Sequence, residues 1–196
     1  ENYKPRIDID PSWEMVELGK VCEKITDGSH YSPETTDSGY PYITVKDLRD
    51  GTIDFENCKK IDDKHYKDLL KNGCKPLIND ILFSKDGTVG KTALVTFDKK
   101  FVVLSSLAIV RPDLEKVSEK YLYFLMSTDC FINKAIDNKT GVAIKRIVLK
   151  TLKTIQIPLP PLEIQHQIVA QIEKEQQLVN ANKQLIDLFE KKIKDR

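Results

Sequence analysis

The stretch from Ser84 to Val95, SKDGTVGKTALV, comes closest in this sequence to a phosphate-binding motif, because a glycine-rich run ends in Gly-Lys-Thr. A P-loop places its first glycine five positions before the second, so that successive backbone N–H groups surround the phosphates of a nucleotide. Counting back from Gly90, that position holds Lys85. The spacing therefore argues against nucleotide hydrolysis.

The neighbouring residues also predict a different local structure. The segment TALVTF that follows is β-branched and aromatic, which is typical of a strand, whereas a P-loop leads into a helix. With LINDILF as the preceding strand, Gly87 and Gly90 are expected to form the turn between two strands. The tip of this turn offers Lys85, Thr88 and Lys91 to a partner, as loops between strands often do.

No other group of reactive side chains has the spacing of a catalytic, metal or redox centre. Asp47, Asp50 and Asp54 follow no acid–base pattern. The cysteines and histidines form neither a C-x-x-C pair nor a helical ligand pair. They are Cys22, Cys58, Cys74, Cys130, His30, His65 and His166. We expect reduced, partly buried thiols, no metal, no cofactor and a protein that binds without catalysis.

Length and composition predict a globular protein. The 196 residues suffice for one domain with a core plus one further element, and 40% apolar and 31% charged residues are typical of soluble chains. No apolar run approaches the roughly 18 residues of a membrane span, and the N-terminus lacks the apolar region of a signal peptide. We expect a cytoplasmic protein without membrane contact.

Charge is balanced overall but concentrated locally. The formal net charge is +1, so composition alone gives no argument for nucleic acid. The stretch from Asn138 to Lys153 nevertheless contains five basic residues and no acidic one. It could contact phosphates or form the solvated face of a strand, and the residues alone leave both possibilities open.

The pattern of elements predicts an α+β fold whose larger, first part is rich in β-structure. Residues 1–157 alternate short β-like runs with turn signals, among them PYITVKDL, GTIDF, DILFS, FVVLSSLAIV and LKTIQIPL. Two helices are expected within this part. The first spans about 62–72 before Gly73, and the second begins after the N-cap candidate Ser118.

A proline-rich linker at 158–162 and one long helix at 163–196 are expected to complete the chain. No proline or glycine follows Pro161. Apolar residues at alternating steps of three and four predict a coiled-coil seam, in which polar positions fix register. The seam contains Ile168, Ile172, Val179, Asn182, Ile186, Phe189 and Ile193. We expect it to pair with the same helix of a second copy. Leu178 and Leu185 widen the apolar stripe, which could also fold back on the domain.

Several motifs together resemble the DNA specificity subunits of type I restriction-modification systems. One segment resembles the start of a target-recognition domain, WEMVELGKVCEKITDGSH. Two more resemble its internal β segments, NDILFSKDGTVGKTALV and LSSLAIVRP. TGVAIKRIVLKTLKTIQIPLPPLEIQHQIV resembles the closing signature, in which a double proline joins a strand to a long helix. The match departs at Ile164, where a glutamate is common.

The resemblance implies a mixed, β-rich target-recognition domain with a few helices, followed by one long C-terminal coiled-coil helix that acts as a spacer. Such a domain reads one half of a bipartite site in double-stranded DNA. The implied partners are methyltransferase (modification) subunits and restriction subunits, which perform the catalysis. A full subunit has two recognition domains, so this chain is expected to be a half-subunit that forms a homodimer, or a piece of a longer chain.

Candidate DNA contacts are polar and basic residues on four loops. Arg49 could bind N7 and O6 of guanine, and Asp47 could accept from cytosine N4. Each group could equally be structural or merely solvated. The candidates are Ser29, His30, Tyr31, Lys46, Asp47, Arg49, Lys85, Thr88, Lys91, Lys139, Thr140, Lys145 and Arg146.

Three other functions stay open on the sequence alone. The chain could be a coiled-coil interaction module that does not bind DNA, and salt-dependent retention of DNA would separate this from the favoured function. It could be the C-terminal specificity region of a single-chain restriction-modification enzyme. A nucleotide-binding enzyme is the least favoured, because the phosphate-loop spacing fails.

Overall fold

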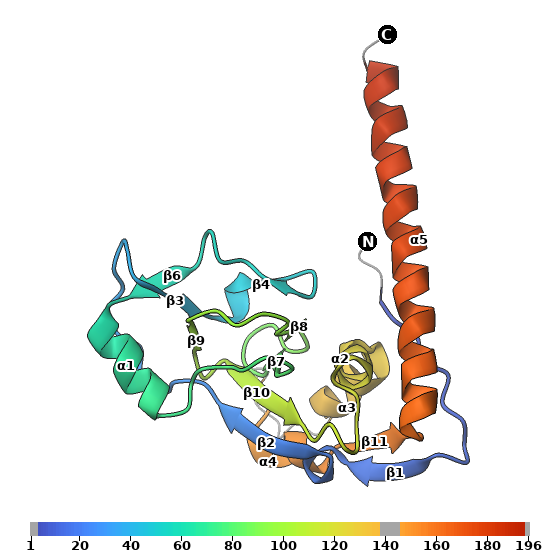
Figure 1. The fold of residues 1–196 in the computed structure, drawn as a ribbon, viewed down its shortest axis with the longest axis horizontal. Coiled ribbons are helices and arrows are strands. Elements are labelled where there is room, and N and C mark those ends of the chain that lie inside the picture. The colour runs from blue at the N-terminus through green and yellow to red at the C-terminus, as the bar shows by residue number, and fades with distance from the viewer. Residues whose placement is uncertain (1–3, 138–145, 195–196) are drawn as a thin grey trace.

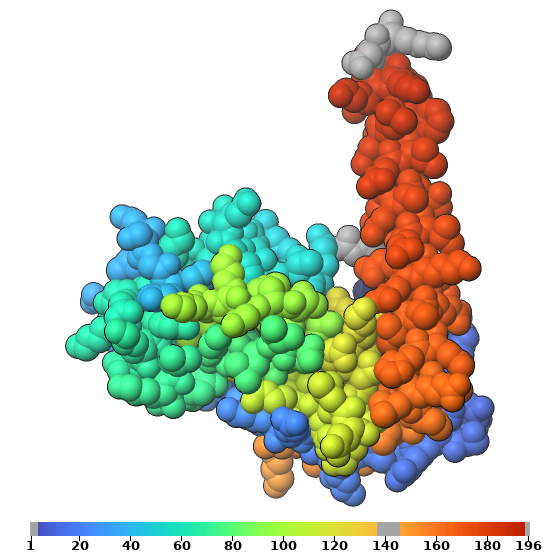
Figure 2. Space-filling view, viewed as in Figure 1, coloured from blue at the N-terminus to red at the C-terminus, as the bar shows by residue number. Residues whose placement is uncertain are grey.

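The computed structural model describes residues 4–137 and 146–194, which form a β-rich domain with a long helix rising from one end (Figure 1). This helix, α5 (Leu162–Lys194), is 33 residues long. In the space-filling view, its first turns pack against the domain and its last turns project beyond it (Figure 2). The expected α+β class with a long C-terminal helix is confirmed.

A four-stranded antiparallel sheet forms the centre of the domain, in the order β2-β10-β7-β8. Its strands are β2 (Cys22–Asp27), β10 (Leu107–Pro112), β7 (Ile81–Ser84) and β8 (Thr92–Leu94). All of β7 and the first four residues of β10 are buried. Burial on both faces explains why these strands carry continuous apolar runs instead of alternating patterns.

Shorter pairings extend the domain beyond the central sheet. β3 (Tyr40–Ile43) lies between β6 (Lys59–Ile61), which is antiparallel to it, and β9 (Val102–Val103), which is parallel. β4 (Leu48–Arg49) and β5 (Thr52–Ile53) form a hairpin. This hairpin follows the short 3-10 helix η2, Val45–Asp47.

The beginning and end of the domain are joined by a two-stranded pairing. β1 (Glu14–Glu17) runs antiparallel to β11 (Gln156–Leu159), and the short 3-10 helix η1 (Leu18–Lys20) leads from β1 to the central sheet. The backbone N–H of Leu18 donates to the carbonyl of Ile155. This pairing places the start of α5 beside the N-terminal strand (Figure 1).

The two helices expected in the domain are present. α1 (Asp63–Lys71) follows Asp62, whose side chain accepts a hydrogen bond from the backbone N–H of His65, and it ends before Gly73. α2 (Glu119–Ser127) begins after Ser118, as expected, but the Ser118 side chain makes no capping hydrogen bond. The second helix buries the aromatic residues Tyr121 and Phe124, which pack in the core.

Two further helices were not expected from the sequence. α3 (Asp129–Asp137) begins directly after α2, where Thr128 accepts a hydrogen bond from Phe131 N–H and marks a new start. α4 (Leu149–Thr154) overlaps the first residues of the run LKTIQIPL, which is expected to be β-structure. Leucine and lysine are good helix formers, so this helix agrees with local propensity, and its Leu152 is fully buried.

The junction between the domain and α5 is shorter than the expected linker at 158–162. β11 continues through Leu159, and Pro158 lies opposite Met15 of β1. Proline is tolerated in β11 because this strand pairs with β1 alone. The missing N–H of Pro158 therefore costs no hydrogen bond to a second neighbouring strand. Pro160 and Pro161 alone form the connection.

The first turns of α5 belong to the domain core, which corrects the expected seam. Ile172 and Val169 are buried in the cluster formed by the central sheet and α2, and Ile168 packs against the same cluster. Ile172 is therefore covered within the chain and is not available to a partner helix, whereas Ile168 is half-buried. Val179 is half-buried, while the seam residues Asn182, Ile186, Phe189 and Ile193 are exposed.

Candidate nucleic-acid interface

The glycine-rich stretch forms the turn between β7 and β8, as the sequence predicts, and leads into a strand. Ile81 to Phe83 pair with Leu94 to Thr92. Ser84 closes the turn, since its hydroxyl donates to the Thr88 carbonyl at 2.6 Å and accepts from Lys91 N–H at 2.8 Å. The geometry is a strand–turn–strand hairpin without the helix N-terminus that a P-loop needs.

Lys85 does not lie at the tip of this turn. Its side chain is 2% exposed, and its ammonium is 3.2 Å from Asp27 Oδ1 and 3.3 Å from Asp86 Oδ2. A buried ammonium requires such carboxylate partners because desolvation of an unpaired charge is costly. Lys85 is therefore buried instead of lying at the tip, and Thr88 is the exposed one of the three residues expected there.

Lys91 is also engaged within the fold. Its ammonium donates to the carbonyls of Val45 at 3.3 Å and Leu48 at 3.0 Å. These two carbonyls border η2 and the start of β4. Lys91 thus attaches the β7–β8 turn to the hairpin that carries Arg49, although its side chain remains partly exposed.

The loop that follows β2 is fixed by backbone contacts. Gly28 is required where the chain passes the carbonyls of Val103 and Leu104, because a Cβ there would overlap both. Ser29 is buried, and its backbone N–H donates to Val103 O at 2.8 Å. His30 and Tyr31 remain exposed, and His30 Nε2 lies 3.1 Å from Asp27 Oδ2.

The segment from Thr44 to Arg49 presents two exposed cations above a capped turn. Asp47 accepts hydrogen bonds from both Thr44 N–H and the Thr44 hydroxyl, at 2.7 and 2.8 Å, so it supports η2. Lys46 and Arg49 are exposed. Arg49 Nη1 is 3.5 Å from Asp54 Oδ2. Hydrogen bonds from Asn57 hold the pKa of Asp54 below its usual value, so this partner stays charged at neutral pH.

The fourth candidate group is described only in part, because Lys139, Thr140 and Lys145 lie outside the described residues. Arg146 is exposed, and its Nε is 3.1 Å from Asp86 Oδ1. A backbone bridge also joins Arg146 to Asp86, and Ile147 N–H donates to the Lys85 carbonyl at 2.8 Å. The described end of the basic window, at Arg146, therefore lies next to the β7–β8 turn.

The candidate loops are connected to one another, although they are far apart in the sequence. Through Lys85, the β2 loop and Arg146 meet the β7–β8 turn. Through Lys91, the same turn meets the Lys46–Arg49 segment. The sequence did not reveal Asp27 and Asp86, the acidic residues of these contacts. Each of them precedes a glycine, and an Asp-Gly pair predicts a turn but not an ion pair with a distant basic residue.

A cleft of about 730 Å³ lies between the β4–β5 hairpin and α5. Arg49, Lys91 and Tyr123 line it from the domain, and Gln176, Asn180 and Lys183 line it from the helix. Burial raises the pKa of the Tyr123 hydroxyl, so this group is neutral at physiological pH. The cleft continues the surface of Arg49 towards the helix, and its cations suit an anionic partner.

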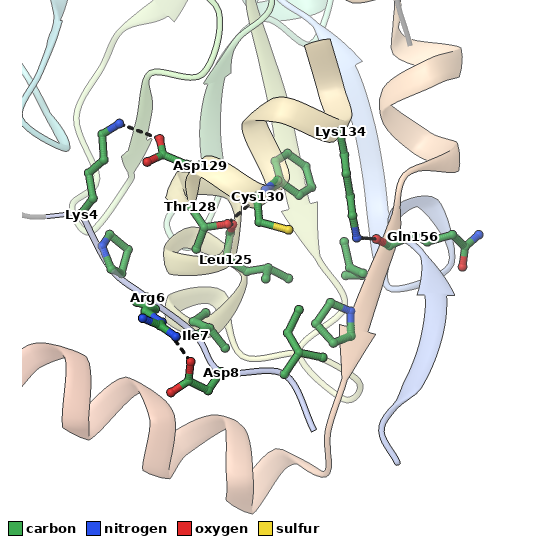
Figure 3. Close-up of a pocket in the computed structure, with 15 residues that line it drawn as sticks. Lys4, Arg6, Ile7, Asp8, Leu125, Thr128, Asp129, Cys130, Lys134 and Gln156 are labelled. Carbon is green, nitrogen blue, oxygen red and sulfur yellow. Dashed lines mark hydrogen bonds and ion pairs between the residues drawn. The ribbon is translucent and has the colours of Figure 1, made fainter. Parts of the chain in front are cut away.

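A second cavity, of about 470 Å³, lies where the N-terminal segment crosses α3 and β11 (Figure 3). Its wall includes the ion pair between Lys4 and Asp129, at 2.6 Å, and the exposed thiol of Cys130. Lys134 donates to the Gln156 carbonyl at 3.4 Å across it. Of the predicted DNA contacts that the structure describes, none lines this cavity.

The part of the chain that the structure describes contains no cluster of three or more His, Cys, Asp or Glu side chains that could hold a metal ion. Within the same residues, no helix has the length and apolar character needed to cross a membrane. The fold is that of a β-rich domain with connected surface loops, attached to a long helix.

Comparison with known proteins places this domain in a family. A model of the type I restriction modification DNA specificity domain matches residues 11–191, which is most of the chain. The chain therefore belongs to this family, in agreement with the resemblance seen in its motifs.

Individual relatives match more than two thirds of the chain. The putative type I restriction enzyme MjaX specificity subunit of Methanocaldococcus jannaschii is 29% identical over 200 residues, covering 97% of this chain and 46% of that protein. The EcoBI specificity subunit of Escherichia coli is 29% identical over 136 residues, covering 69% of this chain and 28% of that protein.

Solved structures of type I restriction-modification proteins have a similar fold. The HsdS subunit from Thermoanaerobacter tengcongensis matches with a TM-score of 0.62 at 26% identity, covering 92% of this chain and 41% of that one. A chain from a study of complex assembly and conformational transition of the type I R-M system matches with a TM-score of 0.68 at 25% identity, covering 98% and 45%. This chain spans less than half the length of each of these relatives.

Proposed function

We propose that this chain binds double-stranded DNA in a sequence-specific manner, as one recognition half of a type I restriction-modification specificity subunit. The observation that carries the proposal is the connection of the candidate loops through Lys85 and Lys91. A binding surface assembled from separate loops needs such cross-links, because each base contact must be held at a fixed position relative to the others.

The exposed residues on these loops divide into two roles. Arg49 is the candidate for base readout, because a guanidinium can donate to both N7 and O6 of guanine in the major groove. Lys46 and Arg146 suit phosphate contacts, which fix orientation without reading sequence. Thr88, His30 and Tyr31 add polar groups on the neighbouring turns.

The second half of α5 is proposed to pair with another helix and set the distance to a second recognition domain. Ile186, Phe189 and Ile193 are exposed on the described chain, and burying a large apolar side chain contributes about 1.5–3 kcal/mol. In an antiparallel pair of two copies, the recognition domains would lie at opposite ends of a rod and read the two halves of an interrupted site.

The proposed partners and location follow from the family. Methyltransferase subunits and restriction subunits would carry out the chemistry in the cytoplasm, and this chain would direct them to the site without a cofactor of its own. The chain is short relative to its relatives, so a second recognition domain could come from a second copy or from a longer chain. The single-chain restriction-modification enzyme is the alternative form of the same function.

Selection from a random-sequence pool of duplex DNA tests the proposal. We expect the purified chain to enrich a short common sequence, and Arg49→Ala to lose preference at one base pair of it. Arg6→Ala, which removes the same charge outside the candidate loops, serves as the control and should leave the selected sequence unchanged. Retention of DNA with no enriched sequence would contradict specific recognition, and no retention at low salt would favour a protein-interaction module.

A further inference from the structure

Five side chains lie in a row across the base of the candidate interface, and basic groups alternate with carboxylates along it. The order is His30, Asp27, Lys85, Asp86 and Arg146. The four successive nitrogen–oxygen distances are 3.1, 3.2, 3.3 and 3.1 Å. Each carboxylate uses one oxygen towards Lys85 and the other towards a candidate DNA contact.

The row is buried in the middle and open at both ends. Lys85 has a side-chain exposure of 2%, whereas those of His30 and Arg146 are 66% and 55%. The carboxylates between them are mostly covered, at 19% for Asp27 and 26% for Asp86. The central ammonium is therefore shielded from solvent, and the two outer groups reach the surface.

Backbone hydrogen bonds hold the central residue in place. Lys85 N–H donates to the Ser106 carbonyl at 2.9 Å, and the Lys85 carbonyl accepts from Ile147 N–H at 2.8 Å. The Lys85 ammonium donates a hydrogen bond to Asp86, but its contact with Asp27 is an ion pair without a hydrogen bond. Both carboxylates thus face the Lys85 ammonium, which is buried in the interior.

We propose that Lys85 is a positioning residue for DNA recognition, which holds His30 and Arg146 in one fixed arrangement through Asp27 and Asp86. This inference rests on the proposed function. With Lys85 present, the positive charges of Lys85 and Arg146 balance the two carboxylates. Without it, both carboxylates compete for Arg146, which would be drawn inward and away from a phosphate.

Two simpler roles make different predictions. If Lys85 were only a packing residue, its loss and the loss of Arg146 would affect DNA affinity independently, because effects at uncoupled sites add. If Lys85 touched DNA directly, its replacement would lower the salt dependence of binding by the contribution of one phosphate contact. Coupling to Arg146 distinguishes the proposed role from both.

A double-mutant cycle on the full chain measures this coupling. The variants are Lys85→Met, Arg146→Ala and their combination, titrated with the selected duplex at one salt concentration. We expect Arg146→Ala to weaken binding at least about threefold more in the unmodified chain than in the Lys85→Met background. Lys85→Arg, which keeps the charge, should recover most of the affinity lost in Lys85→Met.

The control is Lys116→Met, which removes an ammonium paired with Asp113 at 2.6 Å. Lys116 follows the end of β10 where Pro112 pairs with Cys22, whereas Asp27 lies at the other end of the same two strands. We expect this variant to bind like the unmodified chain and to show no coupling to Arg146. Coupling of equal size in Lys116→Met would assign the effect to net charge and overturn the proposal.

Other outcomes are equally decisive. If Lys85→Met is folded and the effect of Arg146→Ala is the same in both backgrounds, Lys85 has no positioning role. If Lys85→Met does not fold, Asp86→Asn takes its place, because Asp86 is partly exposed and the amide keeps its shape. If Asp86→Asn only removes a carboxylate that repels DNA, this variant should bind every duplex more tightly. If it removes the positioning of Arg146, it must lower the preference for the selected duplex over other duplexes.

Failure of the inference and failure of the proposed function can be distinguished. If the unmodified chain binds no duplex preferentially, the proposed function fails and the cycle is not interpretable as recognition. If it does bind preferentially and the cycle shows additivity, the proposed function stands and the positioning role of Lys85 is wrong.

Discussion

Gln165 and Ser118 fix the direction in which the long helix leaves the domain. The Gln165 side-chain oxygen accepts from Ser118 N–H at 2.8 Å, and its amide donates to the carbonyls of Pro160 at 2.8 Å and Lys116 at 3.2 Å. Gln165 is 0% exposed. One buried amide therefore links α5 to the start of α2 and to the double proline.

Replacing Gln165 by Met is expected to destabilise the domain. The change keeps the side-chain volume but leaves the Ser118 N–H and the Pro160 carbonyl without partners in the interior, at a cost of about 2–4 kcal/mol for the set. Urea unfolding followed by circular dichroism measures the loss. Gln167→Met, at an exposed position of the same helix, is the control, and an equal loss in both variants would contradict the role of Gln165.

Asp80 and Arg111 form an ion pair in which the carboxylate is fully buried and the guanidinium is partly buried. Arg111 donates from Nε at 2.8 Å and from Nη2 at 2.9 Å, and Leu77 N–H donates to the same carboxylate at 2.7 Å. Asp80→Ala should cost about 3–5 kcal/mol, because it leaves a partly buried guanidinium without its counter-charge.

The matched control for Asp80 is Asp98→Ala, which breaks an ion pair with Lys75 at 3.0 Å. Asp98 is exposed, and a surface pair contributes about 0–1 kcal/mol. Thermal unfolding of both variants checks the difference. Similar shifts in the two melting temperatures would show that the Asp80–Arg111 contact contributes no more than a surface pair.

The four cysteines are free thiols with unequal environments. Burial, with a smaller contribution from Asp113, raises the pKa of Cys22 to about 12, and burial also raises the pKa values of Cys58 and Cys74. A shift from 9.0 to about 12 leaves roughly a thousandfold less thiolate at pH 8.

Alkylation should therefore select Cys130, which is exposed. We expect iodoacetamide at pH 8 to modify Cys130 in the native chain and all four cysteines in denaturant, as counted by mass spectrometry. Raising the pH towards 12 in a range where the chain stays folded should increase the rate at Cys22, because the thiolate form becomes populated. Rapid native modification of Cys22 at pH 8 would contradict its desolvation.

The exposed apolar residues of the distal helix predict an oligomer. Ile186→Lys combined with Phe189→Lys should convert the proposed dimer to a monomer without unfolding the domain, since neither residue lies in the core clusters. Ile172 is unsuitable for this test because it is buried in the domain. Sedimentation equilibrium at micromolar concentrations measures the change.

Gln184→Lys provides the control for charge on the same helix. At 100° per residue, Gln184 lies on the face opposite the seam, so this substitution should leave the dimer intact. A monomeric unmodified chain would contradict self-pairing. The distal helix would then require a second helix from a longer chain or from another subunit.

Local patterns predicted much of the fold, while contacts between distant segments could not be predicted. The hairpin at Gly87 and Gly90 and the limits of α1 follow from turn and cap residues that act within a few positions. The burial of Lys85 depends on Asp27, which is 58 residues away in the chain, and the burial of Ile172 depends on α2. Periodicity indicates that a helix face is apolar, but it does not identify what covers that face.

The candidate interface shows the same division. Residue type and turn position selected Arg49 and Arg146, which are exposed, but they equally selected Lys85, Ser29 and Asp47. Ser29 and Asp47 use their polar groups on nearby backbone, and this requires the three-dimensional path of the loops.

The most direct test of sequence-specific binding is a fluorescence-anisotropy titration at physiological salt with two labelled duplexes. One carries the selected sequence, and the other has the same length and composition in shuffled order. We predict at least about tenfold tighter binding to the selected duplex, because each mismatched base pair costs about 1–3 kcal/mol. Equal affinity for the two duplexes would contradict the account, since contacts to phosphates alone cannot distinguish them.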